Sequence, residues 1–253
     1  MRSARYIKLT IIAIATALLL GCGDDGGNAT GDSQIGQPDG GASVEPSSSF
    51  KSLTQYDVAA GTFEVTTDTA AGVTKVELLA DGKVVAEATA APFSISWDTT
   101  ATPDGVVKLS LKAHADAKNA TSDEIPVVVL NNGEEVTFTE GSEQTVTIDP
   151  ALDNHVKVHW TMPAGVKTLI GVVFWDNREF KMELAMGTGN CPHSGQQACS
   201  ISGESSPLMT AYPEGVATGT LGETLWFVHA GATNEADLAG KTCKFTFKAF
   251  LLK

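Results

Sequence analysis

From residue 51 onward, hydrophobic and polar residues alternate with a period of two, which is typical of β-strands that bury one face. In the clearest case, Phe93, Ile95 and Trp97 are separated by polar residues. Residues 109–115 alternate in the same way. Because the spacing of amphipathic helices is missing from this part of the chain, the pattern predicts an all-β fold.

Turn residues divide this region. Asp81-Gly82 separates two apolar runs and is suited to positive φ, so we expect a β-hairpin there. Asn131-Asn132-Gly133 marks a boundary between two domains, residues 51–132 and 133–253. The second domain has longer alternating runs, and the nearly continuous apolar stretch 169–175 predicts a central strand covered on both sides. We expect two β-sandwiches, the second of jelly-roll type.

The segment before these strands has a different composition. Residues 23–49 are almost all small or polar, with Ile35 and Val44 the only larger apolar side chains. Such a segment buries too little surface to offset its ordering entropy, so residues 22–50 are predicted to be a flexible tether. A coil of this length spans roughly 30 Å root-mean-square.

The first 21 residues have the form of an export signal. Arg2, Arg5 and Lys8 precede an apolar run from Leu9 to Leu20. This run is too short for a transmembrane helix, which needs roughly twenty residues. Residues 1–21 are therefore predicted to be a signal peptide.

The run ends in Leu19-Leu20-Gly21-Cys22, which resembles the lipobox of bacterial lipoproteins. The resemblance implies cleavage before Cys22 and attachment of palmitate-like acyl chains to its thiol, which would anchor the chain to a membrane. Gly23 stands where aspartate would favour inner-membrane retention in some Gram-negative bacteria, so an outer-membrane location is expected. The alternative is an ordinary secretory signal followed by an incidental cysteine.

Residues 57–131 resemble bacterial immunoglobulin-like domains. The resemblance is carried by Val76–Gly82, Ala91–Thr99, Pro103-Asp104-Gly105 and Leu109–Asp116. It implies a seven-stranded sandwich that acts as a spacer or adhesion module. The chain departs from the family at Asp116-Ala117-Lys118-Asn119, where a glycine is usual.

Charge narrows the range of partners. Without residues 1–21 the chain keeps 14 of its 17 basic residues against 30 acidic ones, a net charge of −16. Phosphate binding needs a basic patch, so a nucleic-acid partner is not expected. The acidic residues are scattered, which is typical of a soluble surface.

With Cys22 lipidated, three cysteines remain, which allows one disulfide and one free thiol. Residues 187–207 lack periodicity and are predicted to be a long loop that contains Cys191 and Cys199. We predict that these two cysteines form the disulfide, because exported proteins fold in an oxidising space. Cys243 is predicted to be a buried thiol; its pairing with either of the other two is the alternative. Zinc is not expected because the close ligand pairs of zinc sites are missing.

Candidate chemistry is sparse. His155 and His159 share a strand face with Lys157 between them, and that lysine would repel a metal ion. Nucleophile-elbow, zinc-protease and phosphate-loop motifs are missing, so no catalytic residue and no cofactor is expected. Trp175 and Tyr212 are the candidate ligand-binding aromatics, because each adjoins a turn.

These observations lead to three hypotheses. The first is a non-enzymatic envelope lipoprotein in which an immunoglobulin-like spacer presents a C-terminal sandwich that binds protein or carbohydrate. The second is an exported hydrolase or its accessory domain, whose site would need paired carboxylates or a Ser/His pair. The third is a purely structural component of the envelope.

Overall fold

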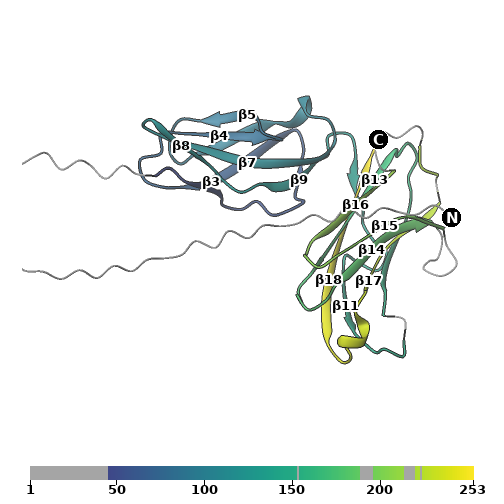
Figure 1. Cartoon of the computed structure of the whole chain (residues 1–253). Coiled ribbons are helices and arrows are strands. Elements are labelled where there is room, and N and C mark those ends of the chain that lie inside the picture. The colour runs from purple at the N-terminus through teal and green to yellow at the C-terminus, as the bar shows by residue number, and fades with distance from the viewer. Residues whose placement is uncertain (1–44, 153, 189–195, 214–219, 223) are drawn as a thin grey trace, which may run out of the picture. The chain divides into compact units, whose positions relative to one another are not determined.

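The computed structural model describes residues 45–152, 154–188, 196–213, 220–222 and 224–253 (Figure 1). Their regular elements are β-strands, apart from two single 3₁₀ turns, η1 (Thr99–Ala101) and η2 (Glu235–Asp237). The predicted all-β fold is therefore confirmed. Ser43–Lys253 form one compact unit that contains two sandwiches.

The first sandwich consists of two sheets. The smaller has the order β1-β3-β6, with β1 Ser48–Phe50, β3 Thr62–Thr69 and β6 Ser94–Asp98. The larger has the order β2-β9-β7-β4-β5, with β8 beside β7; its strands are β2 Val58–Ala59, β4 Lys75–Ala80, β5 Lys83–Ala88, β7 Gly105–Ala115, β8 Lys118–Thr121 and β9 Ile125–Val129.

The turns of this sandwich follow from residue types that tolerate positive φ. Asp81 and Gly82 connect β4 to β5 with φ of 48° and 75°, so the predicted hairpin is present. At the β7–β8 turn, whose residues 116–119 lack the glycine of the resembled family, Asp116 adopts φ 50°. Aspartate tolerates this region better than most residues because its side chain can bond to nearby backbone. The departure from the family is accommodated without glycine.

Hydrogen bonds hold Asn131 and Asn132, two of the turn residues at which the sequence predicts a domain boundary. The Asp104 carboxylate accepts the backbone N–H groups of Asn131 (2.9 Å) and Asn132 (2.8 Å). The Asn131 side chain accepts from the Thr99 hydroxyl (2.7 Å) and donates to the Thr99 carbonyl (3.0 Å). These hydrogen bonds tie residues 131 and 132 to Thr99 and Asp104 of the first sandwich.

The second sandwich also consists of two sheets. One has the order β10-β18-β13-β16 with β11 also on β18, and the other β12-β17-β14-β15. The strands are β10 Glu134–Glu135, β11 Glu143–Thr147, β12 Val156–Thr161, β13 Thr168–Trp175, β14 Met182–Thr188, β15 Gln196–Gly203, β16 Leu208–Tyr212, β17 Leu225–Ala232 and β18 Thr242–Leu252.

Strand pairing in this sandwich is nested. β14 pairs with β15, β13 with β16, β12 with β17 and β11 with β18, all antiparallel. The chain therefore forms one long hairpin of eight strands, and the pairs β13–β18 and β14–β17 roll it into two sheets. This is the jelly-roll arrangement that the sequence predicted.

The period-two pattern accounts for the core. Trp160, Phe180, Leu184 and Phe245 belong to one buried cluster between the two sheets. β13 is covered on both sides as predicted: Leu169 faces this cluster, whereas Ile170 and Val172 belong to another. One expectation was wrong. Part of the aperiodic stretch 187–207 forms β15, which is mostly polar and therefore carries little hydrophobic signal.

A separate buried cluster joins the two sandwiches. It combines Tyr56, Val128 and Leu130 with Ile170, Val172 and Phe250. Lys248 donates to the Tyr56 carbonyl (3.2 Å) and pairs with Asp57 (3.5 Å). Because side chains of both sandwiches are buried in this cluster, each stabilises the other.

Candidate functional site

A pocket of about 540 Å³ lies where β13 ends, beside the connection from β15 to β16. We call it the Trp175 pocket; it is lined by Trp175, Asp176, Arg178, Glu204, Ser205 and Ser206. Its volume falls in the range of small-molecule sites. The pocket combines an indole with charged and hydroxyl side chains, so it can offer both an apolar surface and hydrogen bonds.

Backbone hydrogen bonds hold the two sides of the pocket together. The Trp175 N–H donates to the Ser206 hydroxyl (3.0 Å), which ties the end of β13 to the β15–β16 connection. Asp176 accepts from the backbone N–H of Lys244 on β18 (2.9 Å). Trp175 is only 7% exposed, so most of its indole belongs to the core and the rest lines the pocket.

Most charges around the pocket are paired. Glu204 accepts from Lys181 (2.5 Å), and this contact holds the pKa of Lys181 above its usual value. Glu179 pairs with Lys241 (2.7 Å). Arg178 is exposed and forms no ion pair or hydrogen bond with any residue that the structure describes. Its guanidinium is therefore available to a ligand.

Cys243 lies next to the pocket wall. Its thiol is buried and donates weakly to Asp176 (3.5 Å). Burial, together with the neighbouring Asp176 carboxylate, raises the pKa of Cys243 to about 11. Since the thiolate is the nucleophilic form, Cys243 is a structural residue at neutral pH. Cys243 is a free, buried thiol, as the sequence predicted.

Trp175 and Tyr212 were both predicted as ligand-binding residues, but the structure does not bring them together. Tyr212 is opposite Leu169 at the start of β13, and Trp175 ends that strand. At about 3.3 Å per residue, they are roughly 20 Å apart. Tyr212 instead packs against Trp226, with ring centroids 5.9 Å apart.

The lipidation and disulfide predictions fall on residues that the structure leaves largely undescribed. Cys22 and Cys191 lie outside the described residues, and only the backbone of Cys199 is described, opposite Met186 in the β14–β15 pair. Both predictions therefore stay predictions.

His155, which directly precedes β12, and His159 within β12 have different partners. His159 contacts Glu140 through its ring (2.8 Å) and its backbone N–H (2.9 Å). His155 stacks on His229 at 5.2 Å. Lys157 is opposite His229 in the β12–β17 pair. Among the described residues, no group of three or more His, Cys, Asp or Glu side chains could hold a metal ion.

Sequence reasoning missed a second pocket, which has a volume of about 360 Å³. It is lined by Glu134, Glu135, Val136, Thr137, Thr139, Trp160, Thr161, Pro163 and Leu251. The buried Nε1–H of Trp160 has no hydrogen-bond partner among the described residues. The alternating pattern of β12 correctly predicts that Trp160 is buried. It cannot predict whether the indole N–H finds a hydrogen-bond partner, because such a partner would come from residues far away in the sequence.

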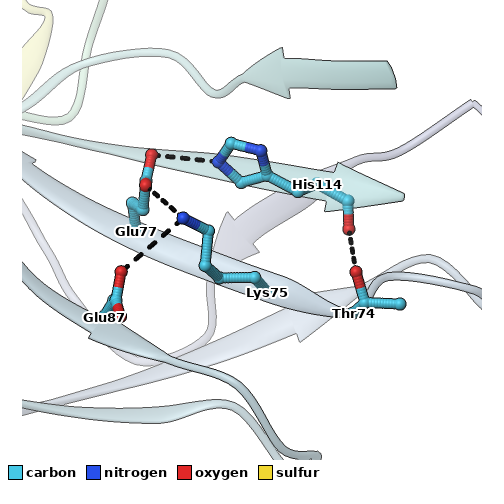
Figure 2. A network of polar contacts seen from close by, with 5 residues as sticks. All are labelled: Thr74, Lys75, Glu77, Glu87 and His114. Carbon is cyan, nitrogen blue, oxygen red and sulfur yellow. Dashed lines mark hydrogen bonds and ion pairs between the residues drawn. The ribbon is translucent and has the colours of Figure 1, made fainter. Parts of the chain in front are cut away.

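Figure 2 shows a polar network on the first sandwich, across β4, β5 and β7. Glu77 lies at its centre and contacts Lys75 (2.5 Å) and His114 (2.9 Å), while Lys75 also reaches Glu87 (3.6 Å). The hydrogen bond from Lys75, followed by that from His114, holds the pKa of Glu77 below its usual value. The network links three neighbouring strands.

Within the described residues, we find no helix whose length and apolar character would let it cross a membrane.

The architecture is thus a two-sheet sandwich followed by a jelly roll. A family model described as a bacterial Ig domain matches residues 46–111, which lie in the first sandwich. The predicted immunoglobulin-like domain is therefore confirmed, although the match covers only part of the chain. A comparison with curated proteins found no match.

Several solved structures resemble parts of the chain at TM-scores of about 0.3. The endo-beta-1,4-mannanase from Thermotoga petrophila is 23% identical over 37% of this chain and 22% of its own, with a TM-score of 0.30. The fibronectin(III)-like modules of Clostridium thermocellum CbhA are 14% identical over 66% and 78%, with a TM-score of 0.32. The CBM51-2 and INT domains of Clostridium perfringens ZmpB are 6% identical over 59% and 38%, with a TM-score of 0.26. Likenesses this weak support no functional argument.

Proposed function

We propose that the chain is a non-enzymatic lipoprotein of the bacterial cell envelope. Lipid on Cys22 anchors it, with the outer membrane the location favoured by Gly23. The bacterial Ig domain acts as a spacer, and the jelly roll binds a carbohydrate. The export-type leader and the lipobox-like residues 19–22 support the location.

The observation that carries the binding function is the Trp175 pocket. Its volume of about 540 Å³ suits a small ligand or one or two sugar units better than a protein surface, which needs a larger contact area. An indole beside hydroxyl and charged groups matches the mixed character of a sugar ring, which has apolar C–H faces and polar edges. The pocket carboxylates are already engaged, Glu204 by the Lys181 ammonium and Asp176 by the backbone N–H of Lys244, which supports binding rather than acid–base chemistry.

The function can be tested by blocking the pocket. The chain from residue 22, with Cys22→Ser to prevent cross-linking, is applied to a glycan array. Ser205→Phe places a ring at the exposed pocket wall without removing core atoms, so glycan signals should fall to background. Ser142→Phe adds the same ring at an exposed position that does not line the pocket and should leave the signals unchanged.

Two outcomes would contradict the proposal. Equal signals from the unblocked chain and Ser205→Phe would show that binding occurs elsewhere. No retained glycan at all would remove the carbohydrate function, and capture of a protein in a parallel pull-down would then assign the jelly roll to protein binding.

A further inference from the structure

Arg178 is unusual within this chain. It is the only arginine among residues 22–253, where the other basic residues are lysines. Several lysines of both sandwiches are paired with carboxylates, for example Lys108 with Glu124 and Lys244 with Glu143. In a chain with so many carboxylates, an arginine without an ion pair among the described residues lacks an evident structural role.

Neighbouring carboxylates do not compensate Arg178. Glu179 is engaged by Lys241 and Glu204 by Lys181. Asp176 is held at β18 by the Lys244 N–H and the Cys243 thiol. The guanidinium is therefore the one cation lining the Trp175 pocket, and no described carboxylate lies within ion-pair distance of it.

The chemistry of the side chain indicates what it would bind. A guanidinium is planar and its N–H groups match the two oxygens of a carboxylate, which gives bidentate hydrogen bonds. Ser205 and Ser206 line the same pocket, and Ser206 uses its oxygen to accept from Trp175, which leaves its O–H free to donate. The pocket thus offers a cation, two hydroxyls and part of an indole.

We propose that Arg178 binds the carboxylate of an acidic sugar whose ring lies in the Trp175 pocket. This inference rests on the proposed carbohydrate function and specifies its ligand class as uronic-acid-bearing glycans. The carboxylate would pair with the guanidinium, and the ring hydroxyls would bond to Ser205 and Ser206. A neutral sugar would leave the Arg178 charge unpaired.

The experiment compares an acidic ligand with its methyl ester, in which the carboxyl groups carry no charge. Binding of oligogalacturonate and of its fully methyl-esterified form is measured by titration calorimetry on the chain from residue 22 with Cys22→Ser. We expect the acid form to bind about tenfold or more tightly than the ester, because the ester cannot make the charge-assisted pair. Alginate and hyaluronan oligomers extend the test to other uronic acids.

Two variants isolate the arginine. Arg178→Gln keeps hydrogen-bonding capacity but removes the charge, and should lower the affinity for the acid form about tenfold while leaving the ester unaffected. Lys167→Gln removes one charge from an exposed lysine that directly precedes β13 and does not line the pocket. It should bind the acid form like the parent chain.

Each remaining outcome decides the matter. Equal affinity for acid and ester, or an unchanged affinity in Arg178→Gln, would overturn the carboxylate assignment. If the chain bound a neutral glycan on the array and no uronic acid, the carboxylate assignment would also be overturned, but the carbohydrate function would stand. If the chain bound no glycan, both the carbohydrate function and the carboxylate assignment would be contradicted. Preference for a peptide with a free C-terminal carboxylate over its amide would reassign Arg178 to peptide binding.

Discussion

Trp160 and Trp226 stand opposite each other on β12 and β17, and both are nearly fully buried, 5% and 3% exposed. They differ in one hydrogen bond. The Trp226 Nε1–H donates to the Gly222 carbonyl (3.3 Å), whereas that of Trp160 has no partner among the described residues. A buried donor without a partner costs free energy that a bonded donor does not.

We therefore predict that Trp226→Phe destabilises the chain more than Trp160→Phe. Both changes remove similar ring area, but only Trp226→Phe breaks a hydrogen bond, so its free energy of unfolding should fall by about 1 kcal/mol more. Urea unfolding of the two variants measures the difference. Equal losses would mean that the Nε1–H of Trp160 is satisfied in solution, for example by a water in the adjoining pocket.

Cys243 provides a second prediction at this scale. Its raised pKa, about 11 against a usual 9.0, means that the folded chain holds the proton more tightly than the unfolded chain. The resulting stability is fully present below pH 9 and is lost as the pH rises toward 11. Iodoacetamide labelling at pH 8, followed by peptide mapping, should modify Cys243 slowly in the folded chain and rapidly in urea. Rapid labelling of the folded chain would contradict the buried, protonated thiol.

At the scale of elements, the network of Figure 2 connects β4, β5 and β7 through Glu77. The side chain of Glu77 is 13% exposed and that of Glu87 is 54% exposed. Exposed ion pairs contribute little because water and salt screen them, whereas partly buried ones are screened less. The two glutamates therefore form a matched pair for an experiment.

Glu77→Gln should lower the melting temperature at pH 7, and Glu87→Gln should have little effect. Because the folded-state pKa of Glu77 is lowered, its contribution is present above the unfolded pKa of about 4.3 and is lost as the pH falls through the lower folded value. At a pH well below both values, Glu77→Gln and the parent chain should melt alike. A pH-independent difference would indicate a packing effect instead.

Much of the element level could be predicted from the sequence because its causes are local. Alternation and turn residues predicted the β4–β5 hairpin and the buried face of β12. β15 was missed because its residues are mostly polar, so no hydrophobic alternation marks it as a strand. It is a strand because it pairs with β14.

The site could be predicted only in part. Trp175 was identified because it adjoins a turn, but its distance from Tyr212 depends on the register of β13 against β16, which joins residues far apart in sequence. Arg178 and Ser205 come together for the same reason. No local signal reports that an arginine will be left unpaired.

At the scale of the whole molecule, the expected anchor is the lipid on Cys22. Labelling with a palmitate analogue should be lost in Cys22→Ala, because no other residue of the leader region resembles an acylation site. Cys243→Ala, which changes a buried cysteine, should keep the label. Label that persists without Cys22 would contradict lipidation at this residue, and a parent chain that takes no label would support an ordinary secretory signal.

The nested pairing of the jelly roll has a consequence for how the chain reaches its native state. β18 completes one sheet by pairing with β11, so that Glu143 lies opposite Thr246, and with β13. Contacts between residues so far apart in sequence form slowly, since a long loop must close first. In a chain delivered N-terminus first, the strands of the bacterial Ig domain all precede residue 130 and can pair before β18 is available. The jelly roll must wait for β18, and its unpaired strands would be exposed to aggregation and proteolysis until then.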